Sequence, residues 1–288
     1  MQKRGDISLT NIMHKIAVLL GLLMSYSVEA QYYFNDLLAN KQTHAQYQLL
    51  RKWKVRSLTV VAAPERPLDK EEVLINQEIS MDGKRIVIYS NENSGKTYRT
   101  TTQYEGGKLT KTVAGTRTGD ISTQYAYTST GLPQKIQSTT RDTSLGINQL
   151  EVHVYSYQRD TVPDFAYVIR DNADTLRVNF IIDSLQLVAE ERWMRGNKQV
   201  ERYYYYYDNN RRLTDIVRFN NKAGQLLPDY IFSYDDVGRV KKMIQVPRYG
   251  NNYLSWEYVY DDKGLKTTEK MTSKDKQQSA TIYYRYNY

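Results

Sequence analysis

The chain contains no cysteine, only three histidines and only six prolines among its 288 residues. Without cysteine it can form no disulfide, thiolate nucleophile or cysteine-based metal site. The histidines (His14, His44 and His153) are too scattered for a zinc-binding motif. No apolar run approaches the roughly 20 residues that a membrane-spanning helix needs. We therefore expect no cofactor and no metal, and the sequence assigns no catalytic, cofactor-binding or metal-binding residue.

Tyrosine is the residue that the chain has in excess, with 27 copies against five phenylalanines and three tryptophans. An apolar content of 40% is enough for a packed core, and 25% charged residues argues against both a disordered chain and a membrane helix bundle. The net charge of +8 is spread along the chain. This spread indicates solvated strand faces and turns, so we expect no nucleic-acid partner.

Residues 1–30 carry the features of a secretory signal peptide in the usual order. Basic residues, the last of them Lys15, precede the apolar run 16–24, and Ala30 is the small residue before the expected cleavage site. Nine apolar residues are too few for a retained anchor. We therefore expect cleavage, no transmembrane span afterwards, and a secreted, periplasmic or cell-surface location.

The rest of the chain divides into three segments. Residues 31–62 read as an N-terminal cap of one helix and one strand. The capping-box pattern Thr43–Gln46 predicts a helix over 43–53, and the β-branched run at 55–61 predicts the strand. Residues 63–72, with two prolines, read as a linker, and 73–288 as one repeat domain.

Short β-type runs alternate with turn signals throughout the repeat domain. Hairpin turns are predicted at Asp82-Gly83, at Gly106-Gly107 and around 131–133. No helical periodicity is sustained there. The pattern predicts about 14–18 strands after residue 73.

Self-comparison shows a repeat of the form aromatic-x-Tyr-Asp-x-x-Gly/Asn-Arg/Leu-apolar, clearest at 203–216, 231–244 and 257–270. Its reference tyrosines are Tyr207, Tyr234 and Tyr260, with weaker copies at residues 104, 127, 157 and 182 and a last tyrosine at 286. The aspartate after each tyrosine is suited to accept backbone hydrogen bonds in a turn. Gly238 and Gly264, with Asn210 taken as their counterpart, are the positions expected to adopt positive φ.

This YxYDxxGRL-type pattern resembles the YD repeat of bacterial RHS/YD-repeat proteins. The resemblance covers roughly residues 100–288, but the chain has few copies and no RHS-core protease signature. It implies β-hairpins arranged in a long curled sheet, which in that family can wrap into a shell. The predicted fold class is all-β: an elongated, curled antiparallel meander of hairpin repeats with one short N-terminal helix.

Two hypotheses of function follow. The first is an exported, non-enzymatic β-repeat protein that serves as an interaction scaffold at the bacterial cell envelope, with a protein or a surface glycan as partner. The alternative is a glycan-binding protein, or a glycan hydrolase that uses turn carboxylates such as Asp235 and Asp261 together with tyrosine platforms. The tyrosine-rich repeats and the lack of a catalytic motif favour the first.

Expression with the leader should yield a mature protein that begins at Gln31, whether translation starts at Met1 or at Met13, because signal peptidase cuts after a small residue such as Ala30. Intact-mass measurement of the purified protein tests this. Retention of the apolar run 16–24 would contradict it.

Overall fold

The computed structural model describes residues 31–63, 71–91, 97–158, 161–220, 224–247, 252–276 and 279–288. The expected signal peptide at 1–30 and residues 64–70 of the expected linker lie outside the described residues. The chain forms two compact units. One contains the residues up to Thr123 together with Thr140–Ile147 and Tyr284–Tyr288, and the other contains Gln124–Thr139 and Asn148–Tyr283.

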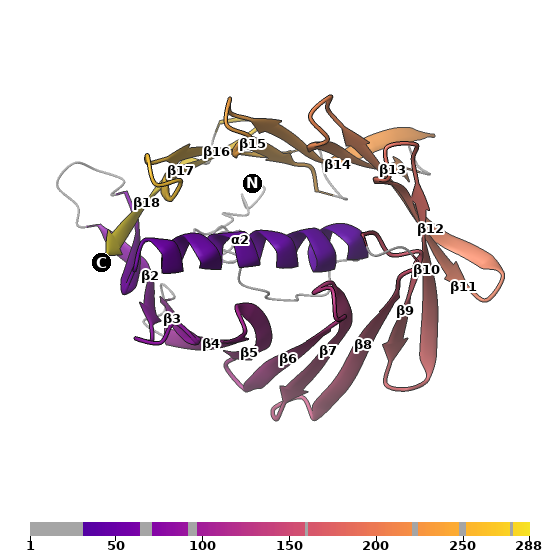
Figure 1. Cartoon of the computed structure of the whole chain (residues 1–288), viewed down its shortest axis with the longest axis horizontal. Coiled ribbons are helices and arrows are strands. Elements are labelled where there is room, and N and C mark those ends of the chain that lie inside the picture. Colours follow the sequence, from indigo (N-terminus) through magenta and orange to yellow (C-terminus); the bar gives the residue numbers. More distant parts are fainter. Residues whose placement is uncertain are drawn as a thin grey trace, which may run out of the picture. The chain divides into compact units, whose positions relative to one another are not determined.

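Two helical segments precede a long series of strands (Figure 1). The helices are η1 (Tyr33–Leu38) and α2 (Ala39–Lys52). The strands of the first half are β1 (Ser57–Ala62), β2 (Glu72–Ile79), β3 (Arg85–Asn91), β4 (Thr97–Glu105), β5 (Lys108–Gly115), β6 (Gly119–Tyr127), β7 (Pro133–Asp142), β8 (Ile147–Ser156) and β9 (Phe165–Arg170). Those of the second half are β10 (Asp174–Ile182), β11 (Val188–Arg195), β12 (Lys198–Tyr207), β13 (Leu213–Asn220), β14 (Gln225–Tyr234), β15 (Val240–Gln245), β16 (Leu254–Tyr260), β17 (Lys266–Ser273) and β18 (Ser279–Asn287).

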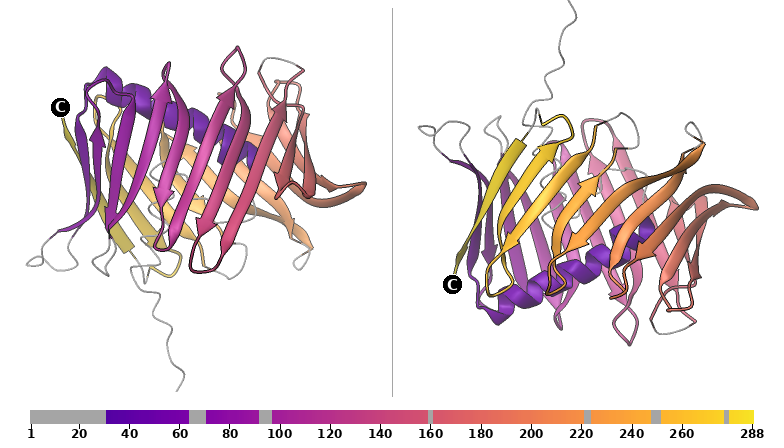
Figure 2. Two further views of the ribbon diagram at one scale, coloured as in Figure 1. Left: turned by 90° about the horizontal axis from the view of Figure 1, so that it is seen from below. Right: turned by 90° about the horizontal axis from the view of Figure 1, so that it is seen from above.

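The strands pair with their neighbours in the chain, and every pairing described is antiparallel. Figure 2 shows successive strands from β12 to β17 running in opposite directions. The predicted all-β antiparallel meander is therefore confirmed. The strands from β2 onward also fall within the predicted number of 14–18.

The expectation of an elongated, curled meander is corrected by the pairing of its two ends. Strand β1 pairs with β2 on one side and with β18 on the other, and the Arg56 N–H donates to the Asn287 carbonyl at 2.7 Å. The first and last strands thus satisfy each other's backbone groups. With a partner on each side, β1 presents no unpaired edge that could be a site for aggregation. The local turn signals in the sequence are the same for an open and a closed meander.

The helix is longer than the sequence predicted. The capping-box residues Thr43 and Gln46 lie inside α2, which follows directly on η1. The helix ends near the predicted place because Lys54 adopts φ +53°. The N–H groups of Lys54 and Val55 then donate to the carbonyls of Arg51 and Leu50, which is the Schellman pattern that closes a helix.

Helix α2 contacts the strands of its own unit through Tyr47, which is 2% exposed. The Tyr47 ring stacks on that of Tyr104 in β4, with centroids 3.8 Å apart and planes within 3°. Its hydroxyl donates to the Gly83 carbonyl at 2.9 Å in the β2–β3 turn. A stacked pair of this kind contributes about 0.5–1.5 kcal/mol beyond the area that it buries. Tyr47 therefore fixes the helix to two neighbouring hairpins.

In the other unit, one face of the sheet is buried and the opposite face is polar. Met243, Trp256 and Met271 are cross-strand partners in β15–β17 and are each at most 6% exposed. The adjacent pair Lys242–Glu257 forms an ion pair of 3.3 Å on the opposite face. The period-2 alternation predicted from the sequence thus separates core from solvent within each strand.

The repeat turns share one backbone conformation. Five positions, each four residues after a reference position, have positive φ: Gly131, Gln186, Arg211, Gly238 and Gly264. The predicted conformation of Gly238 and Gly264 is confirmed. The alignment of Asn210 with them is wrong, because the left-handed residue of that copy is Arg211, at φ +63°. The sequence Asn-Asn-Arg favours aligning an asparagine with the glycines, since asparagine tolerates positive φ more readily than arginine does.

Replacing Gly264 (φ +81°) with valine should lower the free energy of unfolding by more than about 1 kcal/mol, because a β-branched side chain resists positive φ. The neighbouring Lys263→Val is the matched control and should cost much less. Thermal melts of the two variants measure the difference, about 2–4 °C per kcal/mol for a chain of this size. Equal midpoints would contradict the assigned turn.

Candidate functional site

A capped turn recurs along one edge of the second unit and forms the framework of the candidate site. In the turns that begin at Asp208, Asp235 and Asp261, the aspartate N–H donates to the carbonyl four residues later at 2.9 Å. The aspartate carbonyl accepts from the left-handed residue at 2.9–3.0 Å. The turns at Thr128 and Asp183 have the same two hydrogen bonds. All five turns are therefore copies of the same repeated unit.

The aspartate side chain completes each of these turns. Its Oδ1 accepts the N–H of the fourth residue on, which is Arg212 for Asp208 (2.9 Å), Arg239 for Asp235 (2.7 Å) and Leu265 for Asp261 (2.8 Å). Asp183 makes the same contact with Leu187, and the Thr128 hydroxyl replaces it at Leu132. The turn aspartates considered as catalytic candidates therefore act as caps in the structure.

Arginine links one repeat to the next. Arg239 forms an ion pair with Asp235 at 2.6 Å, and its guanidinium lies 4.7 Å from the centre of the Tyr260 ring in the next repeat. Its Nη1 also donates to the Asp261 carbonyl at 3.3 Å. Arg212 makes the equivalent contacts one repeat earlier, with Asp208, the Tyr234 ring and the Asp235 carbonyl. Charge pairing and cation–π contact thus act together.

The reference tyrosines link the repeats in the opposite direction. The hydroxyls of Tyr207, Tyr234 and Tyr260 donate to the carbonyls of Val188, Leu213 and Val240, respectively, at 2.6–2.8 Å. Each acceptor lies six residues after the preceding reference position, and Tyr157 bonds to Pro133 by the same rule. This offset of six residues is the same in all four pairs, although the spacing between repeats varies.

Burial raises the pKa of the repeat tyrosines, whereas a nearby arginine lowers that of a repeat aspartate. Burial raises the pKa of Tyr234 and of Tyr260 to about 12, so both remain hydrogen-bond donors at neutral pH. The Arg212 guanidinium that donates to Asp208 holds the pKa of that carboxyl below its ordinary value. Asp208 is therefore an ionised carboxylate that is already engaged by an arginine and by backbone N–H groups.

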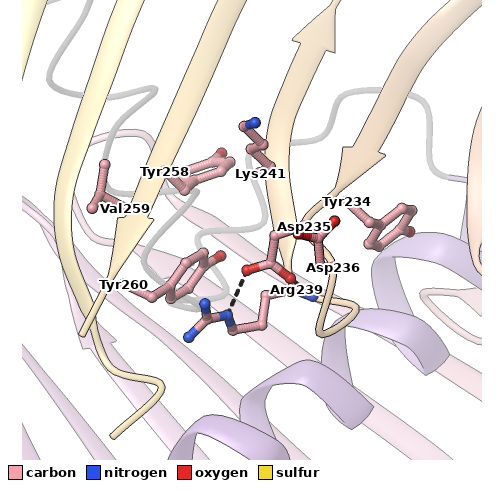
Figure 3. Close-up of a pocket in the computed structure, with 8 residues that line it drawn as sticks. All are labelled: Tyr234, Asp235, Asp236, Arg239, Lys241, Tyr258, Val259 and Tyr260. Carbon is pink, nitrogen blue, oxygen red and sulfur yellow. Dashed lines mark hydrogen bonds and ion pairs between the residues drawn. The ribbon is translucent and has the colours of Figure 1, made fainter. Parts of the chain in front are cut away.

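A pocket of about 330 Å³ lies where two repeats meet (Figure 3). It is lined by Tyr234, Asp235, Asp236, Arg239, Lys241, Tyr258, Val259 and Tyr260. Figure 3 shows the Tyr258 ring and the Lys241 side chain next to each other on one side of the pocket, with Asp235 and Arg239 paired below them. Aromatic walls with a few polar groups are typical of small-molecule sites.

The structure brings only part of the sequence candidates together. Asp235 and Asp236 line the pocket, whereas Asp261 and Asp262 do not. His44 accepts the Leu109 N–H at 3.0 Å, and His153 contacts Glu151 at 2.8 Å, so both histidines have local structural partners. In the part of the chain that the structure describes, no group of three or more histidine or acidic side chains is placed to hold a metal ion.

Sequence reasoning missed Tyr258 and Lys241, although Tyr258 is the first tyrosine of the motif's Tyr-x-Tyr pair. It also missed carboxylates buried inside strands. Glu191, with 0% exposure, accepts from Trp193 Nε1 and from the Tyr205 hydroxyl, both at 2.6 Å. The sequence signal that could have indicated these groups is the alternation of strand residues between the two faces of the sheet.

Across the described ranges, no helix combines the length and the apolar character required to cross a membrane.

No family model matches the chain, and no curated protein does. Among solved structures it is similar to a porin-like protein from Bacteroides uniformis ATCC 8492, with 9% identity over 81% of this chain and 98% of that chain and a TM-score of 0.38. It is also similar to the Photorhabdus luminescens Tc holotoxin pore, with 11% identity over 73% of this chain and 16% of that chain and a TM-score of 0.30. Likeness at this level carries no inference about activity.

If Asp261 is a turn cap, Asp261→Ala should lower the free energy of unfolding by about 1 kcal/mol, because the Leu265 N–H loses its acceptor. Asp262→Ala is the matched control, since this exposed neighbour makes no such contact, and it should change stability by less than about 0.5 kcal/mol. Chemical denaturation of both variants measures the contrast. Similar losses in the two variants would contradict the capping role.

Proposed function

We propose that the protein is an exported, non-enzymatic β-repeat scaffold of the bacterial cell envelope that binds another protein or a surface glycan. The observation that carries this proposal is the use of the repeat carboxylates. Asp208, Asp235 and Asp261 each cap a turn, and the first two are also paired with arginine. Such groups support the fold and are poorly suited to proton transfer.

The envelope location rests on the sequence. The basic, apolar and small-residue order of 1–30 favours export, and a chain without cysteine suits an oxidising compartment. The YD-type pattern is also consistent with a surface or secreted role. Within this proposal the signal, cap, linker and repeat segments keep the boundaries 1–30, 31–62, 63–72 and 73–288.

Glycan binding is the second candidate, and the pocket in Figure 3 favours it over glycan hydrolysis. A glycosidase needs one carboxyl as acid and another as nucleophile or base, about 5–10 Å apart. Asp235 is held by Arg239, while Asp236 is exposed. A tyrosine-lined pocket can bind a sugar without either carboxylate acting on it. Tyr260 is a poor platform for stacking a sugar, because the Arg239 guanidinium already lies over its ring.

The mature chain, residues 31–288, should bind a cell-envelope fraction or an immobilised glycan and should release no reducing ends from glycans. Pull-down from envelope fractions and a glycan array test the binding. A reducing-sugar assay tests the absence of hydrolysis. An absence of binding in both formats would contradict the scaffold. Hydrolysis that is lost in Asp235→Asn or Asp236→Asn but retained in Asp262→Asn would favour the enzyme instead.

A further inference from the structure

We propose that the pocket between the repeats of Tyr234 and Tyr260 binds the carboxylate of an acidic saccharide, with Tyr258 and Lys241 as its anchors. This inference rests on the proposed function, because it names the ligand class that such an envelope scaffold would take. The pocket residues, within 234–241 and 258–260, lie in one compact unit.

The Tyr258 hydroxyl is a buried polar group with no hydrogen-bond partner. The residue is 7% exposed, and its hydroxyl is one of the buried polar atoms left unsatisfied. The ring itself is held in place, because Lys266 Nζ lies 4.3 Å from its centre. Leaving a buried donor unpaired costs about 1–3 kcal/mol. A rigid hydroxyl that lines a pocket and lacks a partner is suited to meet a ligand atom.

Lys241 supplies a positive charge beside that hydroxyl. Lys242 and Glu257 are cross-strand partners, so Lys241 and Tyr258 are the next two residues beyond that pair. Both line the pocket, and Figure 3 shows them side by side. The Lys241 side chain is exposed, and it makes no ion pair among the described residues.

The other cations nearby are already neutralised. Arg239 is paired with Asp235, and Lys266 is paired with Glu269 at 2.9 Å. Lys241 is therefore the cation of the pocket that can accept a new anion. One ammonium and one neutral hydroxyl match a single negative charge, since a phosphate dianion is more often held by an arginine fork or by several donors.

The rest of the pocket suits a hydroxyl-rich ligand. The exposed Asp236 can accept hydrogen bonds from sugar hydroxyls. The rings of Tyr234 and Tyr260 also line the pocket, each with an arginine guanidinium over one face. A volume of about 330 Å³ lies in the range of small-ligand sites. A carboxylate at Lys241 and hydroxyls toward Asp236 together describe a uronic-acid type of sugar.

Calorimetric titration with trigalacturonate tests the proposal on residues 31–288, with neutral galactotriose as the uncharged comparison. Trigalacturonate should bind at least tenfold more tightly than galactotriose. Tyr258→Phe and Lys241→Gln should each weaken its binding about tenfold, the scale of one hydrogen bond to a charged group. Lys198→Gln removes the same charge from an exposed strand end outside the pocket and should leave the dissociation constant unchanged.

Thermal melts separate a lost contact from a damaged fold. Tyr258→Phe keeps the ring and removes only a hydroxyl without a partner, so its melting temperature should not fall. Weaker trigalacturonate binding at an unchanged melting temperature supports the proposal. A variant that binds as tightly as the original chain overturns it.

Three further outcomes would overturn the ligand class. These are no binding of trigalacturonate, equal binding of galactotriose, and equal binding of an acidic peptide of similar charge. If one of these outcomes is observed while Tyr258→Phe and Lys241→Gln still bind the envelope fraction, only the proposed pocket is rejected. The scaffold function then stands. Loss of envelope binding by the unmodified chain would instead contradict the proposed function itself.

Discussion

The capped repeat turn is the interaction on which the second unit depends. An aspartate carboxylate accepts the N–H of the fourth residue on, and the residue just before that donor adopts the left-handed conformation. The same turn places a register shift at the reference tyrosine of three strands, β12, β14 and β16. The shift bends each strand end and aims the tyrosine hydroxyl at the preceding repeat. Backbone conformation and side-chain contact are therefore set by a single local motif.

Two kinds of contact then couple neighbouring repeats. Tyrosine hydroxyls reach back to the carbonyl at the start of an earlier strand, and Arg212 and Arg239 reach forward over the next tyrosine ring. No repeat completes these contacts by itself, which is the usual condition of a stacked repeat structure. The carboxylates, guanidiniums and hydroxyls that look reactive in the sequence are for the most part used in this coupling.

Tyr258 is an exception to that pattern, and the proposed ligand site is built on this exception. It lies two residues before the reference Tyr260, but its hydroxyl has no backbone carbonyl to reach. Lys241 and Asp236 likewise make none of the repeated turn contacts: Asp236 directly follows the capping Asp235, and Lys241 lies three residues after the left-handed Gly238. The groups proposed to bind a ligand are therefore ones that the repeat itself does not use.

The sequence by itself determined the local elements: hairpin turns at Gly106-Gly107 and in the repeats, alternating strands, and the left-handed glycines at 238 and 264. These depend on interactions within a few residues, which a sequence pattern records directly. Tertiary structure decided the pairing of β1 with β18, the full length of the helix, and the partners of Asp235 and Tyr258. Those outcomes depend on residues far apart in the chain and on burial. The same tyrosine or aspartate can be a cap, a core residue or a ligand group, according to what packs against it.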